Sequence, residues 1–356
     1  MMSFTVLSLI YFVLISLVII ALVREKSCEK EPTQSATVIV CARNEEDNIP
    51  GLVESLKALD YPEGMLEIFL VDDVSEDRTG EYIDAAQKED PRIRAIHLHE
   101  KEEGFAGKKN AITQAVGMAN GEIILLTDAD CRPGPNWVKR MVACFDEDTG
   151  MVLGFSPIEK AKGLFQHFLE FDCLARVAIQ AGGAFWNVPP YSTARNLAFK
   201  RRVFFEVNGY ESSGKIATGD DFFLTRDVWL KTHRPFRHAM HPESFVMTKR
   251  DNFSKKYVRQ QLRRNGTIFH LAPFYRVVGL FVLAYYVAIP ISIFTLPTRL
   301  WAGSLVIKTI LEWGGMIAAG KRFGYLNVSF LYPLFILYYP LHVFVSSVIG
   351  SLKKYE

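Results

Sequence analysis

Two aspartates at the end of an apolar run are the residues whose types and spacing suggest chemistry most directly. The run 123–126 is followed by Asp128 and Asp130, and then by Pro133 and Gly134. In an extended chain the side chains of residues i and i+2 point to the same side, so we expect the two carboxylates to converge. Converging carboxylates suit Mg²⁺ or Mn²⁺, which takes further ligands from water and a substrate diphosphate. The alternative is a turn in which aspartate serves as a turn former.

The elements that must position these aspartates are short buried strands that alternate with helices. Continuous β-branched and apolar runs predict strands at residues 36–42, 66–71, 93–98 and 122–126. Helical spacing of apolar residues predicts helices from Ile49, over 79–89 and over 111–119. This alternation is typical of an open α/β sheet, mostly parallel and covered by helices on both faces. Ligands of such sheets bind beyond the carboxyl ends of the strands.

Phosphate-binding motifs of other α/β proteins are absent from the sequence. No Gly-x-Gly-x-x-Gly follows the first predicted strand, which disfavours a dinucleotide-binding domain, and no P-loop motif occurs. The formal net charge of +2 gives no sign of a nucleic acid partner. Five cysteines without Cys-x-x-Cys spacing argue against a disulfide framework or a zinc site, and they suit a reducing compartment.

Long apolar stretches at both ends of the chain predict membrane helices. The stretches are residues 4–23, 277–298, 300–320 and 323–352. The third stretch carries Lys308 and Glu312, so it is either an additional span or an interfacial segment. Basic residues at positions 24, 26 and 30 follow the first stretch. The positive-inside rule therefore predicts that residues 24–276 lie in the cytoplasm.

An ordered set of motifs resembles the signatures of the family 2 glycosyltransferases, which have the nucleotide-diphospho-sugar transferase fold called GT-A. The motifs are Ala42-Arg43-Asn44-Glu45, Val71-Asp72-Asp73-x-Ser75-x-Asp77-x-Thr79, Gly107-Lys108-Lys109-Asn110-Ala111, Thr127-Asp128-Ala129-Asp130, Ala194-Arg195-Asn196-Leu197-Ala198-Phe199, Gly209-Tyr210, Gly219-Asp220-Asp221 and Gln260-x-x-Arg263-Arg264. Each motif alone is weak, but the set keeps the family order over roughly residues 35–270. Two positions depart from the family. Asp220 replaces the usual Glu and keeps its charge, whereas Arg264 replaces the usual Trp, which argues against processive polymerisation.

The resemblance implies an inverting, metal-dependent sugar transfer and assigns roles to individual residues. Asp130, with Asp128, would bind Mg²⁺ or Mn²⁺. Asp221, with Asp220 beside it, would be the catalytic base on the acceptor side. Donor-binding roles fall to Ala42, Asn44, Glu45, Asp72, Asp73, Lys108, Lys109, Asp128, Gln260 and Arg263. Ser75 and Asp77 fit a role in capping the following helix.

Several of these segments also have a structural interpretation. Lys108 and Lys109 could belong to a solvated loop, and the pair 72–73 could cap a helix. The basic segment around Arg263 could bind the donor diphosphate or anionic lipid headgroups. The apolar face of residues 163–184 could lie along the membrane and shape an acceptor entrance, or it could pack in the core.

The motifs and the apolar stretches together predict four regions. These are an N-terminal transmembrane anchor at 1–24, a GT-A catalytic domain at 35–250, a basic juxtamembrane segment at 251–275 and two or three transmembrane helices at 276–352. We expect an integral membrane enzyme of the cytoplasmic membrane that takes a UDP- or GDP-sugar and glycosylates a lipid or lipid-linked acceptor. The alternatives are a processive polysaccharide synthase and a non-catalytic sugar-nucleotide-binding membrane protein. The intact Asp128, Asp130 and Asp221 argue against the last of these.

Overall fold

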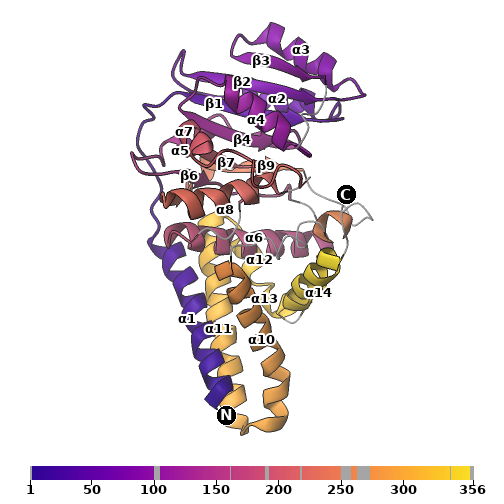
Figure 1. Ribbon diagram of the computed structural model, residues 1–356. Coiled ribbons are helices and arrows are strands. Elements are labelled where there is room, and N and C mark those ends of the chain that lie inside the picture. The colour runs from indigo at the N-terminus through magenta and orange to yellow at the C-terminus, as the bar shows by residue number, and fades with distance from the viewer. Residues whose placement is uncertain are drawn as a thin grey trace. The chain divides into compact units, whose positions relative to one another are not determined.

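The computed structural model describes residues 2–99, 105–160, 162–188, 192–216, 219–249, 258–262, 273–336 and 338–352. The chain divides into two compact units (Figure 1). One unit, here called the sheet unit, consists of Lys26–Glu159 and Asn187–Arg250. The other, the helical unit, consists of Met1–Glu25, Lys160–Trp186 and Asp251–Glu356.

The sheet unit contains an open, mostly parallel sheet of seven strands. Its strands are β1 (Ala36–Ala42), β2 (Leu66–Asp73), β3 (Ile93–Leu98), β4 (Ile123–Asp128), β6 (Met151–Leu153), β7 (Leu197–Lys200) and β8 (Phe236–His238). They lie in the order β3-β2-β1-β4-β7-β6-β8, and β7 runs antiparallel to both of its neighbours. A second, two-stranded sheet pairs β5 (Cys131–Pro133) with β9 (Val246–Thr248). The predicted fold class is confirmed.

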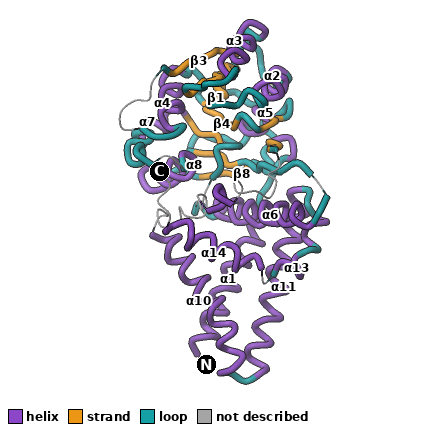
Figure 2. The backbone as a smooth tube through the Cα atoms, turned by 90° about the vertical axis from the view of Figure 1, so that its right-hand side faces the viewer, coloured by secondary structure: helices purple, strands orange, loops and turns teal. Residues whose placement is uncertain are grey.

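Helices cover both faces of the large sheet. They are α2 (Ile49–Lys57), α3 (Thr79–Glu89), α4 (Lys109–Met118), α5 (Trp137–Val142), α7 (Arg201–Glu206), α8 (Asp220–Thr232) and the short 3₁₀ helix η1 (Pro242–Ser244). Figure 2 shows α2 and α5 on one side of the strands and α4 and α7 on the other. All seven residues of β1 are buried, because this central strand is covered on both faces, as its continuous apolar sequence predicts.

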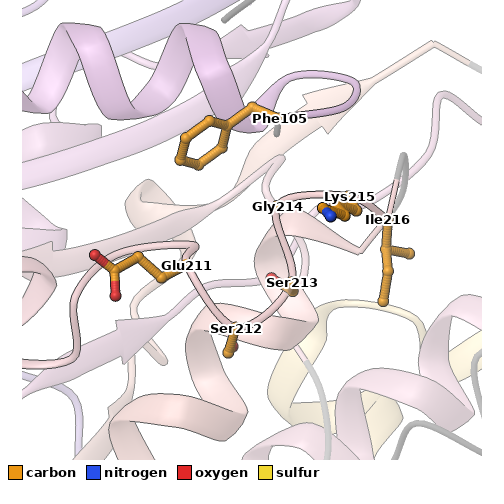
Figure 3. Close-up of a pocket in the computed structure, with 7 residues that line it drawn as sticks. All are labelled: Phe105, Glu211, Ser212, Ser213, Gly214, Lys215 and Ile216. Carbon is orange, nitrogen blue, oxygen red and sulfur yellow. The ribbon is translucent and has the colours of Figure 1, made fainter. Parts of the chain in front are cut away.

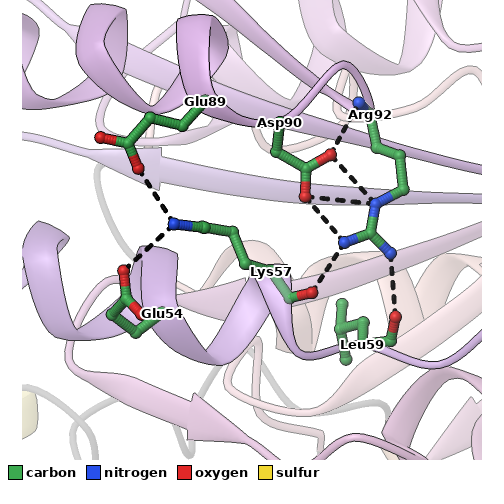
Figure 4. A network of polar contacts seen from close by, with 6 residues as sticks. All are labelled: Glu54, Lys57, Leu59, Glu89, Asp90 and Arg92. Atoms are coloured by element: carbon green, nitrogen blue, oxygen red, sulfur yellow. Dashed lines mark hydrogen bonds and ion pairs between the residues drawn. The ribbon is translucent and has the colours of Figure 1, made fainter.

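A polar network fixes the end of α2 against the turn that precedes β3 (Figure 4). Arg92 pairs with Asp90 at 2.7 Å and donates to the carbonyl oxygens of Lys57 and Leu59 at 2.8 and 2.9 Å. These carbonyls belong to the end of a helix, where no intrahelical N–H group is available to them. The Lys57 ammonium also reaches Glu89 of α3 at 3.0 Å. The network thus joins α2, α3 and the start of β3.

Cys28 and Cys144 form a disulfide within the sheet unit. The prediction that the cysteines form no disulfide was therefore wrong for this pair. The partners are 116 residues apart in the sequence, and their pairing arises only from the fold. With a disulfide present, the cysteine pattern no longer favours a reducing compartment.

The helical unit contains helices that are long and apolar enough to cross a membrane. Its elements are α1 (Met2–Arg24), α6 (Leu164–Phe185), α10 (Pro273–Thr295), α11 (Thr298–Phe323), α12 (Leu326–Ser329), α13 (Tyr332–Phe335) and α14 (Tyr338–Leu352). Among the described residues, three segments meet the length and composition of a span, namely Phe4–Arg24, Phe274–Thr295 and Thr298–Phe323. The described residues of the uncharged run after Phe323 form three helices shorter than a span, of which α14 with 15 residues is the longest. That this run crosses a membrane stays a prediction. Pro333 and Pro340 each lie in the first turn of one of these helices, a position that proline favours.

The charged residues of α11 are buried inside the helical unit and have partners. Lys308 and Glu312 form an ion pair of 2.8 Å, with side chains that are 4% and 12% exposed. Tyr11 of α1 and Tyr332 of α13 each donate to the Glu312 carboxylate at 2.6 Å. Charges inside a membrane helix are tolerated when they face the bundle and are paired. The two charges are therefore compatible with α11 as a span.

Helix α6 packs against the membrane-type helices of its own unit. It contacts α1, α11 and α12, and it runs across α1 and α11 in Figure 1. The ring of Phe168 lies 5.6 Å from that of Phe335, and the Trp186 indole N–H donates to the carbonyl of Leu17 at 3.0 Å. These contacts support the packing interpretation of this segment, with helices of the helical unit as its partners.

Candidate active site

The carboxyl ends of β1, β2 and β4 bring most of the predicted site residues to one edge of the sheet. In the parallel register, Ala42 at the end of β1 lies beside Asp72, and Cys41 lies beside Asp128. Asp73 is the last residue of β2. Adjacent strands lie about 4.8 Å apart. The aspartates 72, 73 and 128 therefore lie at the same edge of the sheet, although they are far apart in the sequence. It is the edge at which ligands of open α/β sheets bind.

The loops that follow β1 and β2 are tied to each other by hydrogen bonds. The backbone N–H groups of Asn44 and Glu45 donate to the hydroxyls of Ser75 and Thr79 at 3.1 and 2.8 Å. Asp77 accepts from the N–H of Thr79 at 3.0 Å, in the first turn of α3. Asn44 has a φ of 53°, a left-handed conformation that asparagine tolerates better than most residues. The geometry agrees with the structural role expected for Ser75 and Asp77, and it shows that Asn44 and Glu45 also hold these loops together.

The two aspartates at the end of β2 have different surroundings. One Asp72 oxygen accepts from the N–H of Ser75 at 3.0 Å, and the other lies 3.4 Å from His97, which in turn contacts Asp84 at 2.8 Å. Asp73 is only 4% exposed, and its Oδ1 has no hydrogen-bond partner within the described residues. Buried polar atoms are rarely left unpaired. Asp73 is therefore the better placed of the two to accept a hydrogen bond from a ligand.

Asp128 is held in its ionised form by two cations. Lys108 Nζ lies 2.7 Å from Oδ1, and Arg195 Nε lies 3.8 Å from Oδ2. Burial raises the pKa of Asp128, but Lys108 and Arg195 outweigh it and the net shift is downward. Burial likewise lowers the pKa of Lys108, while Asp128 and Asp220 together raise it above its usual value. The sequence predicts no role for Arg195, because its position in the chain does not indicate that it lies close to Asp128.

Asp130 does not follow the extended geometry expected from the sequence. Strand β4 ends at Asp128, and Ala129 and Asp130 form a turn, so alternation along a strand does not relate the two carboxylates. The Asp130 carboxylate is half-buried, with the Cys131 thiol 3.4 Å from its Oδ1. No cluster of three or more His, Cys, Asp or Glu side chains in the described part of the chain could hold a metal alone. These oxygen ligands fit Mg²⁺ or Mn²⁺ if a substrate diphosphate and water complete the shell.

The acid pair begins helix α8. Asp221 accepts hydrogen bonds from the backbone N–H groups of Ala194 and Phe222, at 3.1 and 2.6 Å. Burial, followed by the negative charge of Asp220, raises the pKa of Asp221 to about 7. Burial also raises the pKa of Asp220, against the opposing effect of Lys108. A carboxylate whose pKa lies near neutrality is well matched to general-base catalysis.

Lys109 is buried, and it interacts electrostatically with Asp220 and Asp221. The residue is 1% exposed, and its ammonium group donates to the carbonyl oxygens of Ser213 and Ile216, both at 2.7 Å. Burial lowers the pKa of Lys109 to about 8. The geometry favours a role in holding this segment over the donor contact that the resemblance implied. Lys108 remains as the lysine of this motif that lies beside the carboxylates.

The structure also contains a hollow of about 380 Å³ whose lining includes none of the predicted site residues. It is lined by Phe105 and by residues 211–216, and Figure 3 shows the Phe105 ring facing this loop. The N–H of Ala106 donates to the carbonyl of Gly214 at 2.7 Å. This hydrogen bond joins the segment of Phe105 to the loop 211–216, the two segments that line the hollow. The sequence held no signal for this hollow, because its walls come from distant segments.

Two predicted donor-binding residues belong to the helical unit. Gln260 lies in a short helical segment, 258–262, and is half-buried. Arg263 lies outside the described residues, as does Arg264. The residues that the structure does bring together are Ala42, Asn44, Glu45, Asp72, Asp73, Lys108, Asp128, Asp130, Asp220 and Asp221, all within the sheet unit.

Comparison with known proteins identifies the sheet unit. A family model described as Glycosyl transferase family 2 matches residues 37–210. The chain is 28% identical over 197 residues to the probable glycosyltransferase YdaM of Bacillus subtilis, which covers 54% of this chain and 46% of that protein. It is 32% identical over 130 residues to the beta-monoglucosyldiacylglycerol synthase of Trichormus variabilis, which covers 36% and 27%. The matched part thus spans less than half the length of either relative.

A solved structure shares the fold over nearly the whole chain. The mannosyltransferase PcManGT from Pyrobaculum calidifontis, in complex with GDP-Man and Mn²⁺, matches with a TM-score of 0.57 and 20% identity. The match covers 94% of this chain and 96% of that one. The stretch matched by the family model includes the strand ends that carry Asp72, Asp73 and Asp128. Residues 37–210 thus form a family 2 glycosyltransferase domain.

Proposed function

We propose that this protein transfers a sugar, with inversion, from a nucleotide-diphosphate donor to a lipid or lipid-linked acceptor. The observation that carries the proposal is the placement of Asp221. Its carboxylate is fixed by two N–H groups and interacts electrostatically with Asp128, which is itself paired with Lys108. A base for the acceptor and a cation for the leaving group thus occupy one cluster.

On the donor side, the sheet edge offers groups of complementary chemistry to a nucleoside diphosphate. The unpaired Oδ1 of Asp73 can accept a hydrogen bond from a base N–H or a ribose hydroxyl. Lys108 can stabilise the negative charge that develops on the diphosphate as it leaves. Asp130, with Asp128, would hold Mg²⁺ or Mn²⁺, which when bound supplies further neutralisation of that charge. The bound Mn²⁺ and GDP-Man of the mannosyltransferase with the same fold support this assignment.

On the acceptor side, Asp221 removes the proton from the attacking hydroxyl. The hydroxyl oxygen forms a bond to the anomeric carbon while the bond from that carbon to the diphosphate oxygen breaks. The proton passes to Asp221 and the electron pair to the departing nucleoside diphosphate. Because attack comes from the face opposite the leaving group, the anomeric configuration inverts. Asp220 raises the affinity of Asp221 for this proton.

A lipid acceptor and a membrane location are supported by the helical unit and by one relative. Three helices have the length and composition of membrane spans, and the name of the relative from Trichormus variabilis indicates that it makes a glycosyldiacylglycerol. Arg24 occupies the last turn of α1, and Lys26 and Lys30 follow it. The positive-inside rule supports a sheet unit on the cytoplasmic side of the membrane, whereas the Cys28–Cys144 disulfide is unusual for that compartment.

The proposal is tested with membranes that contain the full chain and a panel of radiolabelled UDP- and GDP-sugars. Reactions contain Mg²⁺ or Mn²⁺, with a chelator as control, and label is followed into the organic-extractable phase. Chelator-sensitive label in that phase supports the proposed reaction and names the donor. Label confined to high-mass, water-soluble material would instead indicate a polysaccharide synthase. Nucleotide-sugar binding without transfer from any donor would favour a non-catalytic protein.

A further inference from the structure

Lys109 occupies an unusual position between the donor side and the acceptor side of the site. Its buried ammonium group donates to two carbonyl oxygens, of Ser213 and Ile216, that lie 104 and 107 residues further along the chain. We propose that Lys109 is a positioning residue that ties the segment leading into α8, and with it the acid pair, to the donor-side helix α4. This inference rests on the proposed function and deepens it.

The tie begins at a donor-side group. Lys109 is the first residue of α4 and directly follows Lys108, whose ammonium contacts Asp128 at 2.7 Å. The backbone that positions one lysine therefore positions the other. Lys109 points into the protein, whereas Lys108 points to the carboxylate at the sheet edge. Both lysines interact electrostatically with Asp220, so the segment that carries them borders the acid pair.

The tie ends close to the catalytic acids. Ile216 lies four residues before Asp220, the first residue of α8. A second hydrogen bond, from the N–H of Ala106 to the carbonyl of Gly214 at 2.7 Å, links the same two segments. The loop 211–216 curls beneath Phe105 in Figure 3, so these bonds hold the wall of the hollow as well as the approach to α8.

A lysine suits this position for reasons of chemistry. An ammonium group offers three donors from one atom and can therefore satisfy two carbonyls at once. It also lies 4.6 Å from the centre of the Phe223 ring in α8 and 5.9 Å from that of Tyr210. Attraction between a cation and an aromatic face strengthens as water is excluded. Each of these contacts joins α4 to α8 or to the segment before it.

Lys200 provides a matched control. It is also buried, and it also donates to two backbone carbonyls, those of Asp146 and Glu147, at 2.7 and 2.6 Å. Lys200 pairs with Ile123 at the start of β4. It therefore lies at the edge of the sheet opposite the aspartates. Loss of either lysine leaves two carbonyls without their donor, so both changes should lower stability through the same physics.

The test compares Lys109→Met with Lys200→Met in the full membrane-embedded chain. We expect Lys109→Met to lower kcat by about 100-fold, the order of effect produced by a misplacement of about 1 Å at a reacting group. Binding of Mn²⁺ with UDP or GDP, measured by calorimetry, should be unchanged. Hydrogen exchange at residues 211–216 should become faster. Lys200→Met should lose comparable thermal stability but keep kcat and the protection of 211–216.

Two results would overturn the inference. Equal kcat in the two variants would remove any special role of Lys109. If Lys109→Met lowers nucleotide affinity together with kcat, Lys109 would instead have a donor-binding role. If Lys109→Met does not fold, Lys109→Gln, which retains one donor group, is judged by the same measurements. If the wild type transfers no sugar, the proposed function fails, whereas exchange at 211–216 and nucleotide binding still decide whether Lys109 makes the tie.

Discussion

The protonation state of Asp221 links the structure of the site to its dependence on pH. Burial and the neighbouring Asp220 raise the pKa of Asp221 to about 7, so the carboxyl is largely protonated below that value. A base must be ionised to accept a proton. We therefore expect kcat to rise with pH through about 7 and to level off above it. Steady-state rates from about pH 5 to about pH 9 provide the measurement.

Asp220→Asn is the control for this pH dependence. Removing the neighbouring charge should lower the pH at which half of the maximal kcat is reached, because the ionised form of Asp221 is no longer opposed. A profile that stays flat between about pH 6 and about pH 8 would contradict the assignment of Asp221 as the base.

The roles of Asp130 and Asp221 are separable by isosteric substitution. Asp221→Asn removes the base and should lower kcat by roughly 100-fold or more, while nucleotide binding with Mn²⁺ stays intact. Asp130→Asn should also abolish transfer, but in addition it should weaken Mn²⁺-dependent nucleotide binding, since a neutral amide is a poorer ligand for a hard cation. Calorimetry with UDP and GDP distinguishes the two. Full activity in either variant would refute its role.

At the scale of secondary structure elements, the Cys28–Cys144 disulfide joins the segment that leads into β1 to the end of α5. The closed loop contains more than 100 residues, a length for which the chain-entropy account expects roughly 5 kcal/mol of stabilisation. We expect a reductant to lower the thermal stability of the wild type. Cys144→Ser should start at the lower stability and show no further response to the reductant.

Counting free thiols checks the same disulfide independently. Five cysteines occur in the sequence, and two of them are joined in the structure. Mass spectrometry after alkylation of the protein, unfolded in denaturant but not reduced, should therefore find three modified cysteines, Cys41, Cys131 and Cys173. Modification of all five under these conditions would contradict the disulfide.

Local patterns predicted the elements that depend on local physics. Strands β1 and β3 and helix α3 have the predicted bounds, because β-branched runs and helical spacing are properties of the segments themselves. For residues 323–352, the lack of charge did not predict the division of the run into short helices. The contacts of Lys109, Arg195 and Cys28 were not predictable, since each partner is brought near only by the completed fold.

At the scale of the whole molecule, the two units are interleaved along the chain. Residues Lys160–Trp186 belong to the helical unit, although the chain before and after them belongs to the sheet unit. Phe168, Phe171 and Leu174 of α6 are buried there. The fragment 35–250, which would be an obvious soluble catalytic domain from the sequence, therefore carries a helix whose packing partners it lacks.

We expect this fragment to aggregate or to require detergent. Exposed contiguous apolar surface promotes association in water. Size-exclusion chromatography with and without detergent is the measurement. Replacing Phe168, Phe171 and Leu174 together by Gln serves as the control, and it should restore a monomer. A monomeric wild-type fragment without detergent would show that α6 does not need the helical unit.

The ion pair in α11 has a consequence for how the protein is made. A lysine or aspartate at the centre of a membrane helix opposes insertion by about 2.5–3.5 kcal/mol, and α11, which has the length and composition of a span, carries both Lys308 and Glu312. Besides the ion pair with Lys308, the Glu312 carboxylate accepts hydrogen bonds from the hydroxyls of Tyr11, Tyr286 and Tyr332. Tyr11 lies in α1 and is synthesised long before Glu312. We therefore expect deletion of α1 to weaken the membrane insertion of α11, because Glu312 then lacks one of its hydrogen-bond donors.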